Sequence, residues 1–283
     1  MEKMISDKTF SAERALYHSE GLTLINCRFE GIEDGESALK ESKDIIAKNC
    51  YMDLRYPYWH VRNLELDECE FTAGSRAAMW YDENVRVSRS KLNGIKAFRE
   101  CRGVSVTDSE VVSDEFMWRS RDIAVRGSDI AGKYAFFESS DITLKDVKFS
   151  GKYSFQYVKN LVIEDSELDT KDAFWHAENV TVRNSVVKGE YLGWYSDGLT
   201  LINCRIIGTQ PLCYCKNLKL VDCTTENADL AFEYSDVEAD IKGGIISVKN
   251  PRSGRIVSDG IGEAILTPDS VYPPNAEIVI RGK

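Results

Sequence analysis

The chain has 283 residues, of which 43% are hydrophobic and 29% charged, and it carries a formal net charge of −10 at pH 7. So acidic a chain is a poor general binder of nucleic acid or of anionic membranes, because both need a basic surface. No stretch approaches the 18 apolar residues of a transmembrane helix, and the first residues, MEKMISDKTF, lack the apolar core of a signal peptide. We therefore expect a cytoplasmic protein with reduced cysteines.

An apolar-x-apolar motif recurs along the chain with a nearly constant step. It starts at Leu22, Ile45, Leu64, Val85, Val104, Ile123, Ile142, Leu161, Val180, Leu199, Leu218 and Val237, and every step from Val85 onward is 19 residues. Two apolar residues with a polar residue between them follow the period of a β-strand, and helical periodicity is absent. A fixed period over a dozen units predicts a solenoid.

Other positions of the repeat, counted from the strand start as position 0, are also constant in type. Position 4 is mostly Asn or Asp, position 7 is apolar and position 9 is often Gly. These positions predict an all-β fold, a parallel β-helix of about 12 coils with about three short strands in each. The hexapeptide pattern of left-handed helices is missing, which favours a right-handed helix. We expect one domain, 1–283, with a cap at 1–12, coils at 13–248 and a last coil and cap at 249–283.

Five of the eight cysteines occupy position 5, where the other coils have Ser or Val. These cysteines are Cys27, Cys50, Cys69, Cys204 and Cys223. Small side chains in one column predict an internal stack of free thiols rather than disulfides. Of the three other cysteines, Cys213 and Cys215 form a C-x-C motif with no second His or Cys pair beside it, so we expect neither a metal site nor a cofactor.

Positions 14 and 15 collect the rare residues of the chain. Position 14 contains all five tryptophans, Trp59, Trp80, Trp118, Trp175 and Trp194, and ends at Phe232. Position 15 contains His18, Glu41, His60, Tyr81, Glu100, Arg119, Glu138, Tyr157, His176, Tyr195, Tyr214 and Glu233. Position 13 is apolar, so we interpret position 14 as facing outward, whereas strict alternation leaves the inward register open. Position 15 faces outward in both registers.

Several phrases of the chain resemble one bacterial family, number 3737 of the domains of unknown function. The phrases include GESALKESKDI, YPYWH, KDAFWHAENV and KNPRSGRI, and the resemblance covers nearly the whole chain. It implies a single-stranded, right-handed β-helix of the pectin-lyase-like kind. It implies no established activity, and the signatures of polygalacturonases and the calcium cluster of pectate lyases are missing from the chain.

Two functions fit the aromatic and charged columns. The first is oligosaccharide binding or processing, with His60, Trp59, Tyr81, Trp80, Trp118, Tyr157, Trp175, Trp194 and Tyr195 as binding residues and Glu100, Glu138, Arg119 and His176 as catalytic candidates. Glu100 and Glu138 are two coils apart, about 9.6 Å, so an enzyme here would be glycoside hydrolase-like or lyase-like. The alternative is a non-catalytic scaffold that presents the same aromatic residues to a protein partner or a second copy. Equally, the aromatic residues can stabilise the solenoid by stacking on one another.

Overall fold

The computed structural model describes residues 3–31 and 36–282, and these residues form a right-handed parallel β-helix of about 14 turns without an α-helix. The predicted fold class is confirmed, with more turns than the expected 12. Contacts divide the chain into two units, Met1–Thr143 and Leu144–Lys283.

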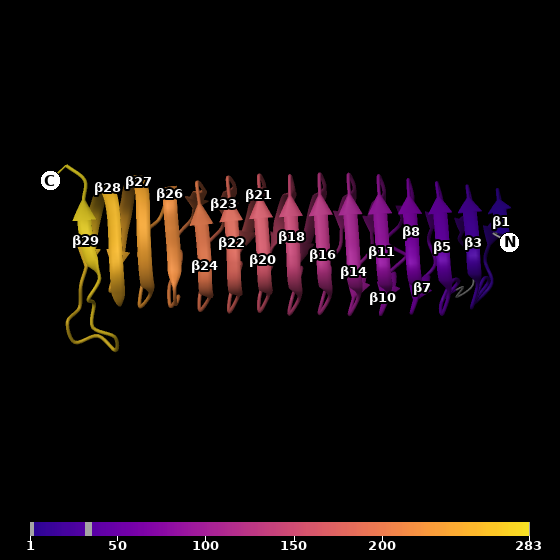
Figure 1. Ribbon diagram of the computed structural model, residues 1–283, viewed down its shortest axis with the longest axis horizontal. Coiled ribbons are helices and arrows are strands. Elements are labelled where there is room, and N and C mark those ends of the chain that lie inside the picture. Colours follow the sequence, from indigo (N-terminus) through magenta and orange to yellow (C-terminus); the bar gives the residue numbers. More distant parts are fainter. Residues whose placement is uncertain (1–2, 32–35, 283) are drawn as a thin grey trace. The chain divides into compact units, whose positions relative to one another are not determined.

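In unit 1 the repeating apolar motif forms the first and longest strand of each coil (Figure 1). These strands are β1 (Lys3–Ser6), β3 (Glu20–Ile25), β5 (Lys43–Lys48), β8 (Arg62–Asp67), β11 (Glu83–Ser88), β14 (Arg102–Thr107), β16 (Arg121–Arg126) and β18 (Ser140–Lys145), the last of which contains the boundary between the units. Their register places position 0 beside position 0, so that Leu64 pairs with Val85 and Val85 with Val104. All three side chains are buried. The 19-residue period therefore arises because each apolar residue packs on its equivalent one coil away.

Two further series of short strands complete the coils of unit 1. The second series is β2 (Thr9–Phe10), β4 (Arg28–Phe29), β6 (Tyr51–Met52), β9 (Glu70–Phe71), β12 (Lys91–Asn93), β15 (Glu110–Val112) and β17 (Asp129–Lys133). The third is β7 (Tyr58–Trp59), β10 (Met79–Trp80) and β13 (Phe98–Arg99), which pair in parallel. The third series contains positions 13 and 14 of the repeat.

Unit 2 repeats the first two series and ends in longer strands. The short strands are β19 (Lys148–Lys152), β20 (Lys159–Glu164), β21 (Glu167–Lys171), β22 (Glu178–Arg183), β23 (Val186–Lys188), β24 (Asp197–Ile202) and β25 (Arg205–Ile207). The long strands are β26 (Leu218–Glu226), β27 (Asp236–Lys249) and β28 (Ser253–Ile265), and β29 (Glu277–Ile280) is the last. Each long strand continues through the turn that separates two strands in the preceding coils, with a register shift in β26 after Leu220.

Both segments that we expected as caps take part in the solenoid. β1 and β2 pair in parallel with β3 and β4, and β28 and β29 continue the stack at the other end. Residues 1–2 and 283 of the expected caps lie outside the described residues. The additional turns come from these segments, whose apolar periodicity is weak.

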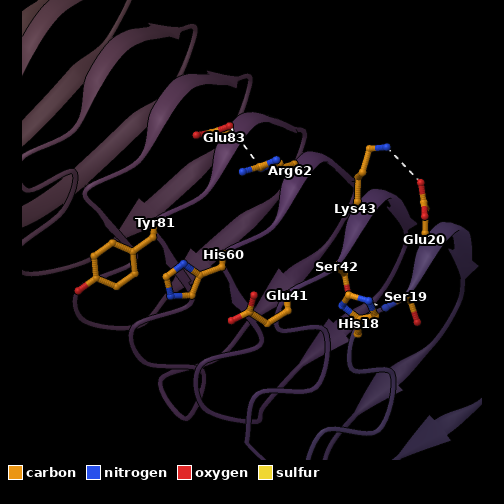
Figure 2. Close-up of a pocket in the computed structure, with 10 residues that line it drawn as sticks. All are labelled: His18, Ser19, Glu20, Glu41, Ser42, Lys43, His60, Arg62, Tyr81 and Glu83. Atoms are coloured by element: carbon orange, nitrogen blue, oxygen red, sulfur yellow. Dashed lines mark hydrogen bonds and ion pairs between the residues drawn. The ribbon is translucent and has the colours of Figure 1, made fainter.

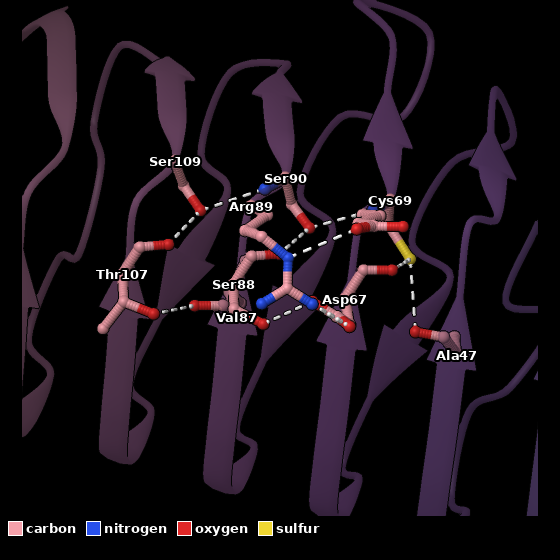
Figure 3. Close-up of polar contacts among 10 residues, drawn as sticks. Ala47, Asp67, Cys69, Val87, Ser88, Arg89, Ser90, Thr107 and Ser109 are labelled. Carbon is pink, nitrogen blue, oxygen red and sulfur yellow. Dashed lines mark hydrogen bonds and ion pairs between the residues drawn. The ribbon is translucent and has the colours of Figure 1, made fainter.

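The small residues at position 5 connect neighbouring coils inside the solenoid (Figure 3). Ser109 Oγ accepts a hydrogen bond of 3.1 Å from the Ser90 amide and donates one of 2.7 Å to the Thr107 carbonyl. Cys69 Sγ donates to the equivalent carbonyl, that of Asp67, at 3.5 Å. Ser and Cys both occur in this column because both are small and both donate a hydrogen bond to that carbonyl. All eight cysteines are free and buried, as predicted.

Candidate functional site

The structure gives positions 13, 14 and 15 three different environments. Position 13 is buried, as for Phe98 and Phe174, which are both 0% exposed. Position 14 is half-buried on the outer side, and position 15 is exposed in each coil from His18 to Tyr195. The outward register that we favoured for position 14 is therefore confirmed, and we call positions 14 and 15 the tryptophan column and the exposed column.

Each tryptophan of the tryptophan column is tied to the backbone of the next coil. Trp59 Nε1 donates to the Ala77 carbonyl at 2.8 Å, and Trp175 Nε1 donates to the Tyr191 carbonyl at 2.7 Å. Trp80, Trp118 and Trp194 make the same bond with Lys96, Tyr134 and Gln210. In the coil that has Gln156 instead, the side-chain amide donates to the equivalent carbonyl at 3.4 Å. The tryptophan column therefore has a structural role, because the indole or amide N–H group of its long side chains donates to a backbone carbonyl of the next coil.

The indoles of neighbouring coils also cover one another. Ring centroids are 5.0 Å apart in the pair Trp59–Trp80 and 5.5 Å apart in Trp175–Trp194, with interplanar angles of 4° and 6°. A sugar ring stacks on a free aromatic face, and inside such a stack one face of each indole is already covered by its neighbour. The outward parts of the tryptophan column are ring edges.

The charged residues of the exposed column in unit 1 form pairs rather than a continuous ladder. Arg119 Nε lies 2.7 Å from Glu138 Oε2, while Glu100 lies 3.8 Å from Nε of Arg99. The side chains of Glu100, Arg119 and Glu138 are 40%, 48% and 41% exposed, so water screens both pairs. The three catalytic candidates of unit 1 do lie on one surface, as expected from the repeat.

The exposed column of unit 2 is a row of stacked rings. His176, the fourth catalytic candidate, lies between Tyr157 and Tyr195, with centroid distances of 4.8 Å and 5.0 Å. Tyr214 follows at 4.7 Å and contacts Tyr234 at 5.7 Å. Our sequence alignment of the last coil was wrong by one residue. Phe232 is buried and Tyr234, not Glu233, continues the row, because this coil has one extra residue.

A groove of about 500 Å³ lies beside the exposed column at the start of unit 1 (Figure 2). It is lined by His18, Ser19, Glu20, Glu41, Ser42, Lys43, His60, Arg62, Tyr81 and Glu83, and we call it the His18–Glu83 groove. Two parallel rows form its walls. One is the exposed column, and the other is the charged residue two positions later, at the start of each first strand.

The two walls offer different chemistry. In the exposed column the rings of His60 and Tyr81 stack at 4.9 Å with a 13° interplanar angle. Figure 2 shows Glu41 beside His60 in the same row. In the other row Lys43 and Arg62 lie 3.1 Å and 3.6 Å from the carboxylates of Glu20 and Glu83. The second row therefore has carboxylate acceptors in its two outer coils and cationic donors in the two coils between them.

The backbone between the two walls rests on a buried polar column. Ser42 Oγ accepts from the Ser19 amide at 3.1 Å, and Asp82 Oδ1 accepts from the Val61 amide at 2.8 Å. Asp82 is fully buried, and its Oδ2 has no hydrogen-bond partner. Burial raises the pKa of the Asp82 carboxyl well above its ordinary value. Burial therefore favours the protonated form of Asp82, which lies in the chain between Tyr81 and Glu83 of the groove wall.

Sequence reasoning found part of this groove. His60 and Tyr81 are among the predicted binding residues, whereas Glu20, Lys43, Arg62 and Glu83 were not considered. The only signal for the missed row is a charged residue two positions after the exposed column, which on its own is typical of any solvated strand end. Among the described residues no cluster of three or more His, Cys, Asp or Glu has a metal-binding arrangement. Likewise, no helix in the described part of the chain could cross a membrane.

Comparison with known proteins identifies a family and a fold. A family model described as "Protein of unknown function (DUF3737)" matches residues 3–279. The surface adhesin PfbA of Streptococcus pneumoniae is similar in structure, with a TM-score of 0.51 and 10% identity over 82% of this chain and 83% of that one. The A-module of the Azotobacter vinelandii mannuronan C-5 epimerase AlgE6 has a TM-score of 0.41 and 12% identity over 96% and 87% of the two chains. No curated protein matches the chain. At 10% identity, the likeness to the adhesin shows the fold alone.

Proposed function

The chain belongs to the DUF3737 family, and we propose that this protein binds a neutral oligosaccharide in the His18–Glu83 groove. The observation that carries the proposal is the pair of parallel polar rows that wall the groove. Residues in each row recur once per coil, at about 4.8 Å. A linear sugar chain presents hydroxyl groups at comparably regular intervals, so successive coils can bind successive sugar units.

The charges of the groove favour a neutral sugar over a strongly acidic one. Three carboxylates, Glu20, Glu41 and Glu83, face two cations, Lys43 and Arg62, which leaves a balance of −3 + 2 = −1 with the histidines neutral. Carboxylates accept hydrogen bonds from hydroxyl groups, and ammonium and guanidinium groups donate to hydroxyl oxygens. The ion pairs within one row hold these groups in place before the ligand arrives, which lowers the entropy cost of binding.

The aromatic end of the groove can position the sugar chain. His60 and Tyr81 stack on each other at the end where Figure 2 shows them side by side. Tyr81 is 38% exposed and its ring also contacts the edge of Trp80. This pair offers a small apolar surface beside the charged residues, which is the combination that ligand sites use.

Calorimetric titration with neutral hexasaccharides of glucose, mannose and galactose tests the proposal. Glu41→Gln and His60→Ala should each weaken binding at least tenfold, because each removes a groove wall residue. Glu138→Gln is the matched control, since it changes a carboxylate of the same exposed column outside the groove. Absence of binding to the whole panel, or equal binding by Glu41→Gln, His60→Ala and the wild type, would overturn the proposal.

The same control tests the catalytic hypothesis for unit 1. If Glu100, Arg119 and Glu138 act on a glycan, the wild type should release shorter or unsaturated products and Glu138→Gln should not. A loss of binding in Glu138→Gln together with normal binding in Glu41→Gln would move the sugar site from the groove to these residues. His176 in unit 2 is tested separately by His176→Phe, which keeps the stacking with both tyrosines and removes the imidazole.

A protein partner is the second candidate function, and the aromatic row of unit 2 favours it. Tyr157 and Tyr195 are 45% and 46% exposed and present ring edges and hydroxyl groups, a composition common in protein interfaces. Their faces are covered by His176 and Tyr214. A pull-down in which Tyr157→Ala and Tyr195→Ala lose a partner that Glu41→Gln retains would support this function for unit 2.

A further inference from the structure

A ladder of Asn and Asp side chains runs along unit 1 at position 18, immediately before each strand start. Asn63 Nδ2 donates to Asp44 Oδ1 at 2.6 Å, and Asn84 Nδ2 donates to Asn63 Oδ1 at 3.0 Å. The three residues have φ between 55° and 57°, the left-handed conformation that Asn and Asp tolerate best. Asn63 and Asn84 thus each donate one side-chain amide to the coil before.

Gly103 interrupts this ladder. It keeps the backbone conformation of the column, with φ of +69°, but has no side chain to donate to Asn84 Oδ1. A Cβ placed on Gly103 would lie 3.1 Å from that oxygen. The column resumes one coil later at Asp122, whose carboxylate accepts from Arg102 Nε at 3.0 Å. The oxygens of Asp44 and Asn63 each accept a side-chain amide from the following coil, whereas Gly103 offers none to the amide oxygen of Asn84.

A cavity of about 490 Å³ lies at this gap. It is lined by Asn63, Asn84, Val85, Arg86, Gly103, Val104, Ser105, Asp122 and Ala124, and we call it the Gly103 groove. Its second wall is position 1, which changes from the long Arg86 to the short Ser105 and Ala124. Between the walls the backbone of Val85 and Val104 lines the groove, because the side chains of both residues are buried in the solenoid. The groove therefore offers an amide, a carboxylate, a guanidinium and a hydroxyl group.

A second cavity of about 350 Å³ extends the Gly103 groove toward β3. The two cavities share Asn63 and Arg86, and the second is also lined by Gly21, Asp44, Ile45, Ile46, Leu64 and Glu65. Together they follow the stacking direction over several coils of unit 1. This length fits an extended chain better than a single small ion. The carboxylates of Asp44, Glu65 and Asp122 outnumber the guanidinium of Arg86, −3 + 1 = −2, which disfavours an acidic ligand.

We propose that the Gly103 groove is a second glycan-binding site, which takes a neutral, linear sugar chain and places a hydroxyl group of one sugar in the gap left by Gly103. That hydroxyl group replaces the missing amide as the donor to Asn84 Oδ1, while Asp122 and Arg86 bind its neighbours. No residue is shared with the His18–Glu83 groove, so this site stands without the function proposed above.

The substitution Gly103→Asn tests the site because it restores the ladder. Asn occurs at this position in five other coils that the structure describes and adopts positive φ in each: Asn63, Asn84, Asn160, Asn179 and Asn217. We therefore expect a folded variant of unchanged or higher thermal stability, after a shift of the flexible Asn84 amide by a few tenths of an ångström. Gly198→Asn, in the same column of unit 2 with φ of +72°, is the matched control.

Titration with the same neutral hexasaccharides, followed by backbone amide chemical shifts, separates the two grooves. The wild type should show shifts around Gly103 and Ser105, and Gly103→Asn should lose them or weaken that binding at least tenfold. Glu41→Gln and Gly198→Asn should retain them. In the wild type, shifts at Gly103 without shifts at Glu41 would support this site and reject the first one. Shifts at Glu41 without shifts at Gly103 would reject this site alone.

Ser105→Arg provides a second variant if Gly103→Asn fails to fold. The new arginine side chain would fill the groove from the opposite wall. The fold already contains an arginine, Arg86, at the equivalent position one coil earlier. Unchanged hexasaccharide binding in whichever of the two variants is folded would overturn the proposal.

Discussion

Trp175 and Trp194 lie one coil apart in unit 2 with their ring centroids 5.5 Å and their planes 6° apart, and each indole N–H donates to a backbone carbonyl of the following coil. The two rings are thus fixed both by stacking and by hydrogen bonding. This arrangement explains the concentration of tryptophan in one column without a ligand.

The first prediction concerns how much the indole hydrogen bond contributes to the free energy of unfolding. Trp175→Ala should lower the free energy of unfolding by about 2–4 kcal/mol, because it removes a half-buried aromatic ring. Trp175→Gln should recover about 1 kcal/mol of that loss, since Gln156 makes the equivalent bond in its own coil. Urea unfolding followed by circular dichroism measures both. Equal stabilities of the Ala and Gln variants would show that the bond contributes nothing.

Asp82 should make the protein less stable as the pH rises. Its carboxyl has a raised pKa in the folded state, whereas in the unfolded chain it ionises near pH 4. The folded state therefore binds an extra proton above that pH, and stability falls by about 1.4 kcal/mol per pH unit until the buried group itself ionises.

Asp82→Ser tests this pH dependence, because Ser42 shows that a hydroxyl group can accept the same backbone bond in this column. The variant should be more stable than the wild type at pH 8, and the difference should shrink toward pH 4. Urea midpoints at several pH values measure it, with the exposed Asp129→Ser as control. A difference that stays constant with pH would contradict the prediction.

Ser and Cys at position 5 should be interchangeable, whereas Ala should not replace them. Ser109→Ala leaves the buried Ser90 amide without its partner and should cost about 1–3 kcal/mol, whereas the Thr107 carbonyl keeps the bond that it accepts from the Arg89 amide. Cys69→Ser keeps a donor to the Asp67 carbonyl and should change stability by less than about 1 kcal/mol. Thermal unfolding would reject this account if both substitutions had the same effect.

The ion pair between Arg119 and Glu138 should contribute little to stability. Both side chains are more than 40% exposed, so a double-mutant cycle with Arg119→Ala and Glu138→Gln should give a coupling of about 0.2–1 kcal/mol. Added salt should reduce it further. A coupling of several kcal/mol would indicate that water is excluded from this surface, which would strengthen its candidacy as a catalytic site.

Much of the fold could be predicted from the sequence because each coil packs on its neighbours in a constant register. Val85 and Val104 are both apolar because they lie beside each other in neighbouring coils. The 19-residue period therefore indicates which residues are in contact. The prediction was wrong where the chain departs from the period. The extra residue before Phe232 shifts the last coil, and the segment around Lys3 joins the solenoid although its pattern is weak.

The candidate site was less predictable than the fold. His60 and Tyr81 could be selected because rare residue types stand out in a column. Charged residues such as Lys43 do not stand out at the surface of a chain with 29% charged residues. A groove depends on the relative heights of neighbouring side chains, and a gap such as that at Gly103 becomes visible only when the residues on either side of it are known.

The constant register has a further consequence for how such a chain can change in length. Residues 104–122 form one period, and Ile123 begins the next period at the position equivalent to Val104, with which it pairs. Removal or duplication of such a period would join coils that already fit one another. The number of coils, and with it the length of any groove along unit 1, can therefore vary by whole modules during evolution while the cross-section stays the same.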